Sequence, residues 1–219
     1  TSTNSSIGLI YALKKILFGI IILLVLKNEM KKICFLGYSK NKTNLISFLR
    51  KKKFKVTEHS NKLLTKKNSK NFDLIVSFGY KKIIKKSVLD CLKRPIINLH
   101  ISYLPFNRGS HPNFWSFVEN TPKGISIHEI DEKIDTPNII FRKKIFFKGS
   151  KRLTFSKTYE ILINKIEDLF IKNFDQILKK NYKIKKLRSK GTFHNKSDLP
   201  RNFKNWNQEI REYLKNHRT

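Results

Sequence analysis

The chain has 219 residues, and its 47 lysines and arginines outnumber its 16 aspartates and glutamates, so its formal net charge is +31. This length suits one compact α/β domain with small additions and excludes a large second domain. A hydrophobic content of 39% allows a packed core, while the two cysteines exclude a disulfide scaffold and show no zinc-binding spacing, so we expect no metal site.

Residues 1–29 form a hydrophobic leader. Residues 7–26 are apolar apart from Lys14 and Lys15, but the uninterrupted run, residues 16–26, is shorter than the about twenty residues that a spanning helix needs. Because Met30 directly precedes the first expected strand, we expect the native protein to start there. The alternatives, in order, are a membrane anchor that contacts lipid through residues 7–26 and a hydrophobic helix docked on the domain.

From Met30 onward, the apolar pattern alternates between strands and helices. We expect strands at residues 33–36, 54–57, 72–78, 95–98, 125–130 and 138–147, and helices at residues 41–53, 83–92, 109–119 and 156–180. This alternation predicts an α/β fold with a mostly parallel, Rossmann-like sheet that is covered by helices on both faces. The predicted catalytic domain covers residues 30–182, and residues 183–219 form a basic C-terminal tail.

Polar side chains follow two of these strands. Asn98 and His100 lie two residues apart, so in an extended chain they point to the same side, at the strand end where α/β sheets bind ligands. Asp135 lies in an acidic loop after the strand at residues 125–130, and it can approach His100 if the two strands are neighbours. These three residues are the candidate catalytic centre.

An amide, an imidazole and a carboxylate together suit acyl transfer to an amine. The amide donates to a developing oxyanion, the imidazole stabilises that oxyanion or moves a proton, and the carboxylate orients the imidazole or takes the proton of the amine through water. By spacing alone, an Asn-x-His pair is more often without catalytic function. The order of several motifs along the chain is more specific than this pair.

Four motifs follow one another between residues 96 and 147: Asn98-Leu-His100-Ile-Ser102-Tyr-Leu-Pro105, Arg108-Gly109, Gly124-Ile-Ser-Ile-His128 and Asp135-Thr136. Their order and spacing resemble the formyltransferase family that uses 10-formyltetrahydrofolate as formyl donor. The resemblance implies the fold of that family. It also implies that Asn98 and His100 bind the oxyanion, and that Asp135 supports His100 and relays the proton of the amine.

The resemblance also places the folate. It implies that the pterin lies near the loop after the strand at residues 72–78, against Phe78, Tyr80, Ile83 and Ile84. Asp131 and Thr136 would then close the other side of the site. Pro137 stands where the family has Gly, so the loop on the folate side is expected to differ, and His128 is expected to be structural because it lies within a strand.

The acceptor amine is expected to belong to a nucleotide-linked amino sugar, because the stretches 104–115 and 191–199 look closest to sugar N-formyltransferases. Ser102, Arg108 and Gly109 are the expected substrate-binding residues. Methionyl-tRNA formyltransferases carry an additional C-terminal domain, for which 35 residues are too few. Glycinamide-ribotide formyltransferases place a Gly-rich phosphate loop after the first strand, where residues 37–44 contain one Gly. Both remain alternatives.

Two further functions stay open. A formyltetrahydrofolate hydrolase uses a related centre, and a degenerate basic domain would bind nucleic acid or anionic membrane. The 38 lysines against 9 arginines favour a solvated surface over a specific nucleic-acid site, which tends to use Arg. We expect a cytoplasmic enzyme with no nucleic-acid partner, with membrane association only through the leader, and a dimer is compatible with the sequence.

Overall fold

The computed structural model describes residues 13–17, 30–130, 138–147, 152–187 and 191–217. The chain divides into two units, residues 1–31 and residues 32–219. In the first unit, residues 13–17 are helical and exposed. Among the described residues, no helix is long and apolar enough to cross a membrane. The expectations for residues 1–29 therefore stay predictions.

The second unit is built on a seven-stranded sheet with the strand order β2-β1-β3-β4-β6-β7-β8. Its strands are β1 (Lys32–Gly37), β2 (Lys55–His59), β3 (Leu74–Phe78), β4 (Ile96–His100), β6 (Gly124–Ile130), β7 (Asn138–Lys144) and β8 (Lys185–Lys186). The pairs among β2, β1, β3 and β4 are parallel, whereas β4–β6, β6–β7 and β7–β8 are antiparallel. Most strands thus run in one direction, as predicted.

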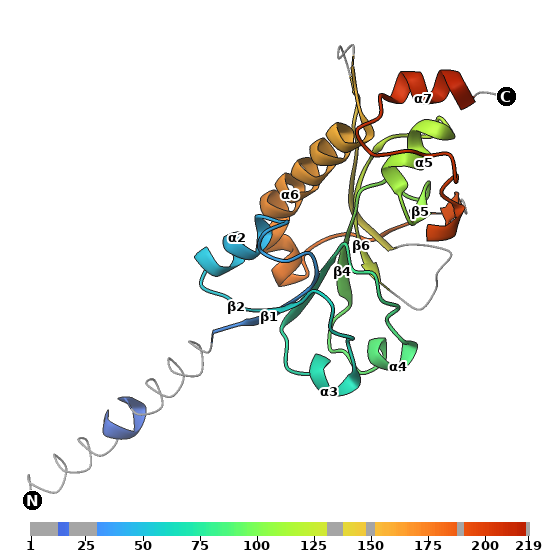
Figure 1. Cartoon of the computed structure of the whole chain (residues 1–219). Coiled ribbons are helices and arrows are strands. Elements are labelled where there is room, and N and C mark those ends of the chain that lie inside the picture. The colour runs from blue at the N-terminus through green and yellow to red at the C-terminus, as the bar shows by residue number, and fades with distance from the viewer. Residues whose placement is uncertain (1–12, 18–29, 131–137, 148–151, 188–190, 218–219) are drawn as a thin grey trace, which may run out of the picture. The chain divides into compact units, whose positions relative to one another are not determined.

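Helices cover both faces of this sheet, which confirms the predicted α/β fold (Figure 1). In β1, Ile33 and Phe35 point to one face, where they join a core with α2 (Leu45–Lys51) and α6 (Phe155–Lys179). The alternate residues Cys34 and Leu36 join a second core on the opposite face. That face is covered by α3 (Lys66–Ser69) and α4 (Lys86–Leu89). The period of two along each strand thus separates the two cores.

The helix predicted at residues 83–92 is shorter in the structure, where α4 covers only Lys86–Leu89. Lys85 has an extended backbone, and the side chain of Ile83 is 86% exposed, so neither residue belongs to a packed helical face. The helix predicted at residues 109–119 begins later as well, because α5 (Pro112–Val118) starts at a proline, whose fixed φ suits a first helical position.

The C-terminal segment predicted as a tail packs within the second unit. It contains β9 (Phe193–His194), the 3-10 helix η1 (Lys196–Asp198) and α7 (Ile210–His217), and β9 pairs with the short strand β5 (Arg108–Gly109). Ile210 and Tyr213 of α7 bury their side chains against Phe114 of α5 and Phe155 of α6. This aromatic cluster attaches the segment to the domain.

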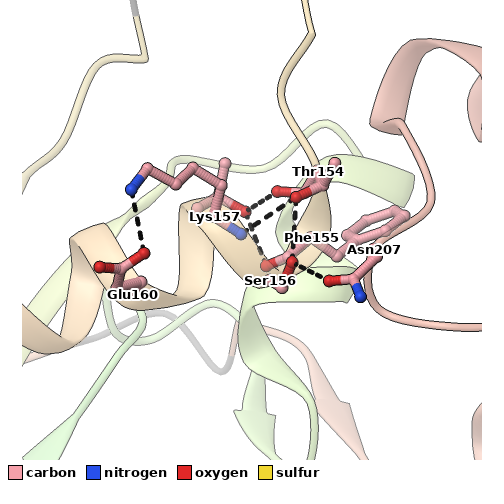
Figure 2. A network of polar contacts seen from close by, with 7 residues as sticks. Thr154, Phe155, Ser156, Lys157, Glu160 and Asn207 are labelled. Carbon is pink, nitrogen blue, oxygen red and sulfur yellow. Dashed lines mark hydrogen bonds and ion pairs between the residues drawn. The ribbon is translucent and has the colours of Figure 1, made fainter.

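The same segment closes the N-terminus of α6 (Figure 2). The Thr154 hydroxyl accepts a hydrogen bond from the backbone N–H of Lys157 at 3.2 Å, as a helix cap does. The Ser156 hydroxyl donates to Oδ1 of Asn207 at 2.6 Å, and the Ser156 N–H donates to the carbonyl of Trp206 at 2.7 Å. The first turn of α6 is thus paired with its own cap and with the C-terminal segment.

A buried carboxylate on α6 holds the N-terminus of α2. Glu167 is 4% exposed and accepts hydrogen bonds from the Thr43 hydroxyl at 2.6 Å and from the backbone and side-chain nitrogens of Asn44 at 3.3 Å each. This carboxylate accepts hydrogen bonds from donors at the N-terminus of α2 that would otherwise have no partner. The contact explains why α2 begins at Leu45 rather than at residue 41.

We expect Glu167→Ala to lower the free energy of unfolding by about 2–3 kcal/mol, because it leaves buried donors unpaired. Chemical denaturation measures this change. Glu160→Ala is the matched control on the same helix, since Glu160 is exposed and pairs with the exposed Lys157, at 3.0 Å. Its loss should stay below about 1 kcal/mol. Equal losses in the two variants would contradict the assigned role of Glu167.

Candidate active site

The candidate site lies on the α3/α4 face of the sheet, over β4 and β6. Ile96 and Ile130 pack into the core on that face, and residues two and four positions away along each strand share it. Asn98 and His100 of β4 therefore point to this face together with His128 and Ser126 of β6. The register confirms the grouping, because Asn98 pairs with His128 and His100 pairs with Ser126.

Asn98 and His128 are joined by a hydrogen bond. The distance from Asn98 Nδ2 to His128 Nε2 is 2.9 Å, and the distance from His128 Nδ1 to the backbone carbonyl of Glu129 is 3.0 Å. A carbonyl oxygen only accepts, so we assign the proton of the neutral ring to Nδ1, and Nε2 accepts from the amide. This tautomer sets the direction of the Asn98 amide, whose nitrogen carries a second hydrogen for another partner.

His100 is held in the same way on the other side of the site. Its Nε2 lies 3.1 Å from the backbone carbonyl of Asn107. Because that carbonyl only accepts, the assigned tautomer carries its proton on Nε2 and leaves Nδ1 with a free lone pair. Burial lowers the pKa of His100, and the bond to Asn107 partly opposes this decrease.

The two imidazoles form an uncharged pair. Their ring centroids are 6.4 Å apart with the planes at 89°. Burial and, to a smaller extent, the neighbouring His100 lower the pKa of His128 to about 4, against the hydrogen bond to the Glu129 carbonyl. Near neutral pH both rings therefore act as one donor and one acceptor each, which suits proton transfer.

Three predicted site residues, Asp131, Asp135 and Thr136, lie outside the described residues. β4 and β6 are neighbours, as an approach of Asp135 to His100 requires. The two strands are antiparallel, so Ile130 lies beside Ile96, at the opposite end of β4 from His100.

The residues predicted to bind the folate differ in exposure. Phe78 is 2% exposed and packs edge-on against Tyr38, with ring centroids 4.8 Å apart. The Tyr80 hydroxyl accepts from the backbone N–H of Leu64 and donates to the carbonyl of Lys62, so it holds that loop. Ile84 packs partly into the core, whereas Ile83 is exposed. Of these four residues, Ile83 has the exposed side chain, so a ligand can contact it without a rearrangement of the protein.

A cavity of about 250 Å³ lies at the segment between α4 and β4, beside the end of β6. It is lined by Leu89, Asp90, Leu92, Lys93, Arg94, Pro95 and Ile130. Ile130 follows His128 by one same-face step of β6, about 7 Å along the strand. The cavity thus lies one such step along β6 from His128.

The residues predicted to bind the acceptor lie in the turn after β4. Ser102 is 2% exposed, and its carbonyl accepts from the Ser126 hydroxyl at 2.7 Å. The Arg108 guanidinium lies 5.9 Å from the ring centroid of Phe193 in the C-terminal segment. Gly109 has φ +84°, and a Cβ there would come within 2.2 Å of the His194 carbonyl oxygen. Gly109 thus permits close contact between two backbone segments.

The sequence did not predict the contacts of two residues at the site. His128 was expected to be structural, and in the structure it hydrogen-bonds Asn98. The signal for this was the alternation of residues 125–130, which places His128 on one face but does not name the neighbouring strand. Asn107 accepts from His100 and lies in a turn two residues after Pro105, where Asn tolerates a positive φ. Within the described ranges, no group of three His, Cys, Asp or Glu side chains could hold a metal ion.

Comparison with known proteins gives a consistent result. A family model described as formyl transferase matches residues 8–159. The methionyl-tRNA formyltransferase of Clostridium acetobutylicum is 33% identical over 117 residues, which cover 53% of this chain and 36% of that protein. The dTDP-4-amino-4,6-dideoxyglucose formyltransferase of Mycobacterium bovis is 27% identical over 128 residues, which cover 58% and 53%. The chain thus spans about a third to a half of the length of these relatives.

Solved structures share the fold over most of their length. The formyltransferase PseJ from Anoxybacillus kamchatkensis was solved in complex with UDP-4,6-dideoxy-4-formamido-L-AltNAc and tetrahydrofolate. It is 34% identical, with a TM-score of 0.73, and the match covers 84% of this chain and 97% of that one. A sugar N-formyltransferase from Shewanella is 22% identical with a TM-score of 0.64, covers 78% and 79%, and shows the same fold.

The lowered pKa of His128 predicts a dependence of stability on pH. The ring titrates at its usual value near 6.5 in the unfolded chain and at about 4 in the folded chain, so the unfolded chain binds more protons between these values. Stability is therefore fully present above about pH 6.5 and falls as the pH falls towards 4, by at most about 1.4 kcal/mol per pH unit.

We expect His128→Gln to flatten this part of the curve, because the glutamine oxygen accepts from Asn98 and does not titrate. Urea unfolding at pH 4.5, 5.5, 6.5 and 7.5 measures the slope in both proteins. Histidines away from the site contribute to both curves alike, so the difference reports His128 together with its coupling to His100. Parallel curves for the two proteins would rule out a buried neutral His128.

Proposed function

The chain belongs to the formyl transferase family, and we propose that it moves a formyl group from 10-formyltetrahydrofolate to the amine of a nucleotide-linked amino sugar. The observation that carries this proposal is the pair Asn98 and His100, which point to one face of β4 and are each held in one orientation. The match to PseJ, solved with a UDP-linked formamido sugar and tetrahydrofolate, supports the choice of donor and acceptor.

The chemistry follows from the two assigned tautomers. The amine attacks the formyl carbon, and the carbonyl oxygen gains negative charge. The second N–H of Asn98 donates to that oxyanion, while its first N–H is bound to His128. Nδ1 of His100 accepts the proton that the amine loses, because its Nε2 already donates to Asn107.

The protonated imidazole then stabilises the adjacent oxyanion until the intermediate collapses. The bond from the formyl carbon to the folate nitrogen breaks, and that nitrogen takes up a proton. Formyl is thus exchanged between two amines, with no covalent enzyme intermediate. Asp135 is proposed to support the charged His100 and to relay the proton onward.

We place the donor in the cavity beside β4 and β6. Leu89, Leu92 and Ile130 supply apolar surface for a flat ring. Asp90 and Arg94 also line this cavity; the Asp90 carboxylate pairs with Lys86 at 3.8 Å, and the Arg94 guanidinium donates to the carbonyls of Ile177 and Leu178. Asp131 and Thr136 are proposed to complete this side, as the resemblance to the family implies.

We place the acceptor on the other side of His100, over the turn that contains Ser102, Arg108 and Gly109. A nucleotide diphosphate carries two negative charges, which suit Arg108 and the net charge of +31. The sugar amine would then meet the formyl carbon between Asn98 and His100. This arrangement brings donor and acceptor from opposite ends of β4.

Asn98→Ala and His100→Ala should each lower kcat by about a hundredfold to ten-thousandfold, because they remove the oxyanion donor and the proton acceptor. The assay follows tetrahydrofolate release from 10-formyltetrahydrofolate with UDP- and dTDP-linked 4-amino sugars. Asn71→Ala, in an exposed turn, is the matched control and should leave kcat unchanged. Wild-type rates in both site variants would refute the proposed centre.

The same assay separates the alternative functions. Transfer only to glycinamide ribotide or methionyl-tRNA would reject the amino-sugar acceptor while keeping the formyl transfer. Formate release without any amine would instead indicate a hydrolase.

Leu92→Glu should raise KM for the folate donor at least about tenfold, since it places a charge on the apolar wall of the donor cavity. KM for the amino sugar should change less than twofold, because the two substrates are placed on opposite sides of His100. Leu63→Glu is the control, because Leu63 is 44% exposed and lies outside the cavity lining. A raised KM for the sugar alone would move the donor elsewhere.

A further inference from the structure

Asn107 is the most fully connected polar residue next to the candidate catalytic pair. It is 0% exposed and has φ of 56°, in the left-handed region. Its carbonyl accepts from His100 at 3.1 Å, its Nδ2 donates to Glu119 at 3.2 Å, and its Oδ1 accepts from Thr121 at 2.7 Å. Its backbone N–H donates to the hydroxyl oxygen of Thr192 at 2.8 Å.

The bond from Asn107 to Thr192 connects the turn after β4 to the C-terminal segment, 85 residues further along the chain. Two backbone bonds run beside it: Arg108 N–H donates to the Thr192 carbonyl at 2.9 Å, and Ser110 N–H donates to the His194 carbonyl at 2.8 Å. The close contact between the two segments requires a glycine at position 191, because a Cβ on Gly191 would come within 2.1 Å of the Pro105 carbonyl oxygen. The two segments are thus closely fitted along their backbones.

We propose that Thr192 is a positioning residue for His100 and acts through Asn107. The residue that fixes the His100 tautomer is a buried asparagine in a backbone conformation that few side chains adopt, and surrounding bonds must hold it there. The Thr192 hydroxyl is the partner of its N–H, and a buried N–H without a partner is costly. This inference rests on the proposed function, because it assigns the C-terminal segment a role in formyl transfer.

The effect of Thr192 follows from the backbone geometry at Asn107. The N–H and carbonyl of Asn107 belong to two consecutive peptide units that meet at its Cα, so a shift of this residue that brings its N–H to a new partner also moves its carbonyl relative to His100. Nε2 of His100 would then lose its acceptor, and the neutral ring could carry its proton on either nitrogen. A ring protonated on Nδ1 cannot accept the proton of the amine.

The test compares Thr192→Val with Thr192→Ser, since valine keeps the shape and removes the oxygen, whereas serine keeps the oxygen. Thr57→Val, on the edge strand β2, is the matched control. We expect Thr192→Val to lower kcat about tenfold, the change that loss of one hydrogen bond of about 1.4 kcal/mol produces. KM for both substrates should stay within about twofold, and serine should restore kcat.

A second measurement does not depend on activity. The ring ¹⁵N NMR shifts of His100 should report the Nε2-protonated tautomer in the native chain and in Thr192→Ser, and a mixture of tautomers in Thr192→Val. If the valine variant does not fold, Thr192→Ala removes the same oxygen with a smaller side chain. An unchanged tautomer together with unchanged kcat would overturn the proposal.

The two proposals fail in different ways. A native chain that transfers no formyl group would refute the proposed function, while the ¹⁵N shifts would still decide whether Thr192 controls the His100 ring. A lower kcat in Thr192→Val with an unchanged His100 tautomer would refute the positioning role and leave the proposed function intact.

Discussion

The antiparallel pairing of β4 with β6 is the constraint on which the site depends. Its register places Asn98 beside His128, and the period of two along both strands directs these side chains away from the core under α6. A shift of one residue would turn Asn98 and His100 into that core and expose its apolar residues instead. The burial of Ile97, Leu99, Ile125 and Ile127 therefore stabilises the orientation of the polar residues between them.

Burial also sets the charge state of the site. The chain carries a net charge of +31, yet the two imidazoles at the centre are kept neutral by desolvation. A neutral ring has one donor and one acceptor nitrogen. The donor nitrogen of His128 bonds to the backbone carbonyl of Glu129, and that of His100 bonds to the backbone carbonyl of Asn107. The remaining nitrogens face the functional amide and the reacting groups. Backbone geometry thus sets the direction of each hydrogen bond in the proposed mechanism.

The C-terminal segment links stability to function in this fold. Its aromatic residues pack with Phe114 and Phe155, and its polar groups close the first turn of α6. From that anchored position, Thr192 reaches the turn after β4, where Asn107 meets His100. The segment therefore contributes to the stability of the domain. In the proposed mechanism it also positions His100, the proton acceptor.

The amino-acid sequence alone determined the α/β class and the approximate positions of the long elements. It also identified Asn98 and His100 as candidate catalytic residues. These features depend on local periodicity and on short motifs, which neighbouring residues encode directly. The resemblance of the motifs also pointed to the family that the family model then matched. The sequence assigned His128 a structural role but did not identify Asn98 as its partner, because a position in a strand does not identify the residue across from it.

Only the tertiary structure decided the antiparallel direction of β6, the bond from His128 to Asn98, and the contact of Thr192 with Asn107. Each joins residues that are distant in sequence, by 30 positions in one case and 85 in another. Such pairs are selected by the packing of whole elements and by the need to satisfy buried polar groups. No local pattern in a single sequence contains that information, because it arises when the strands and the C-terminal segment meet.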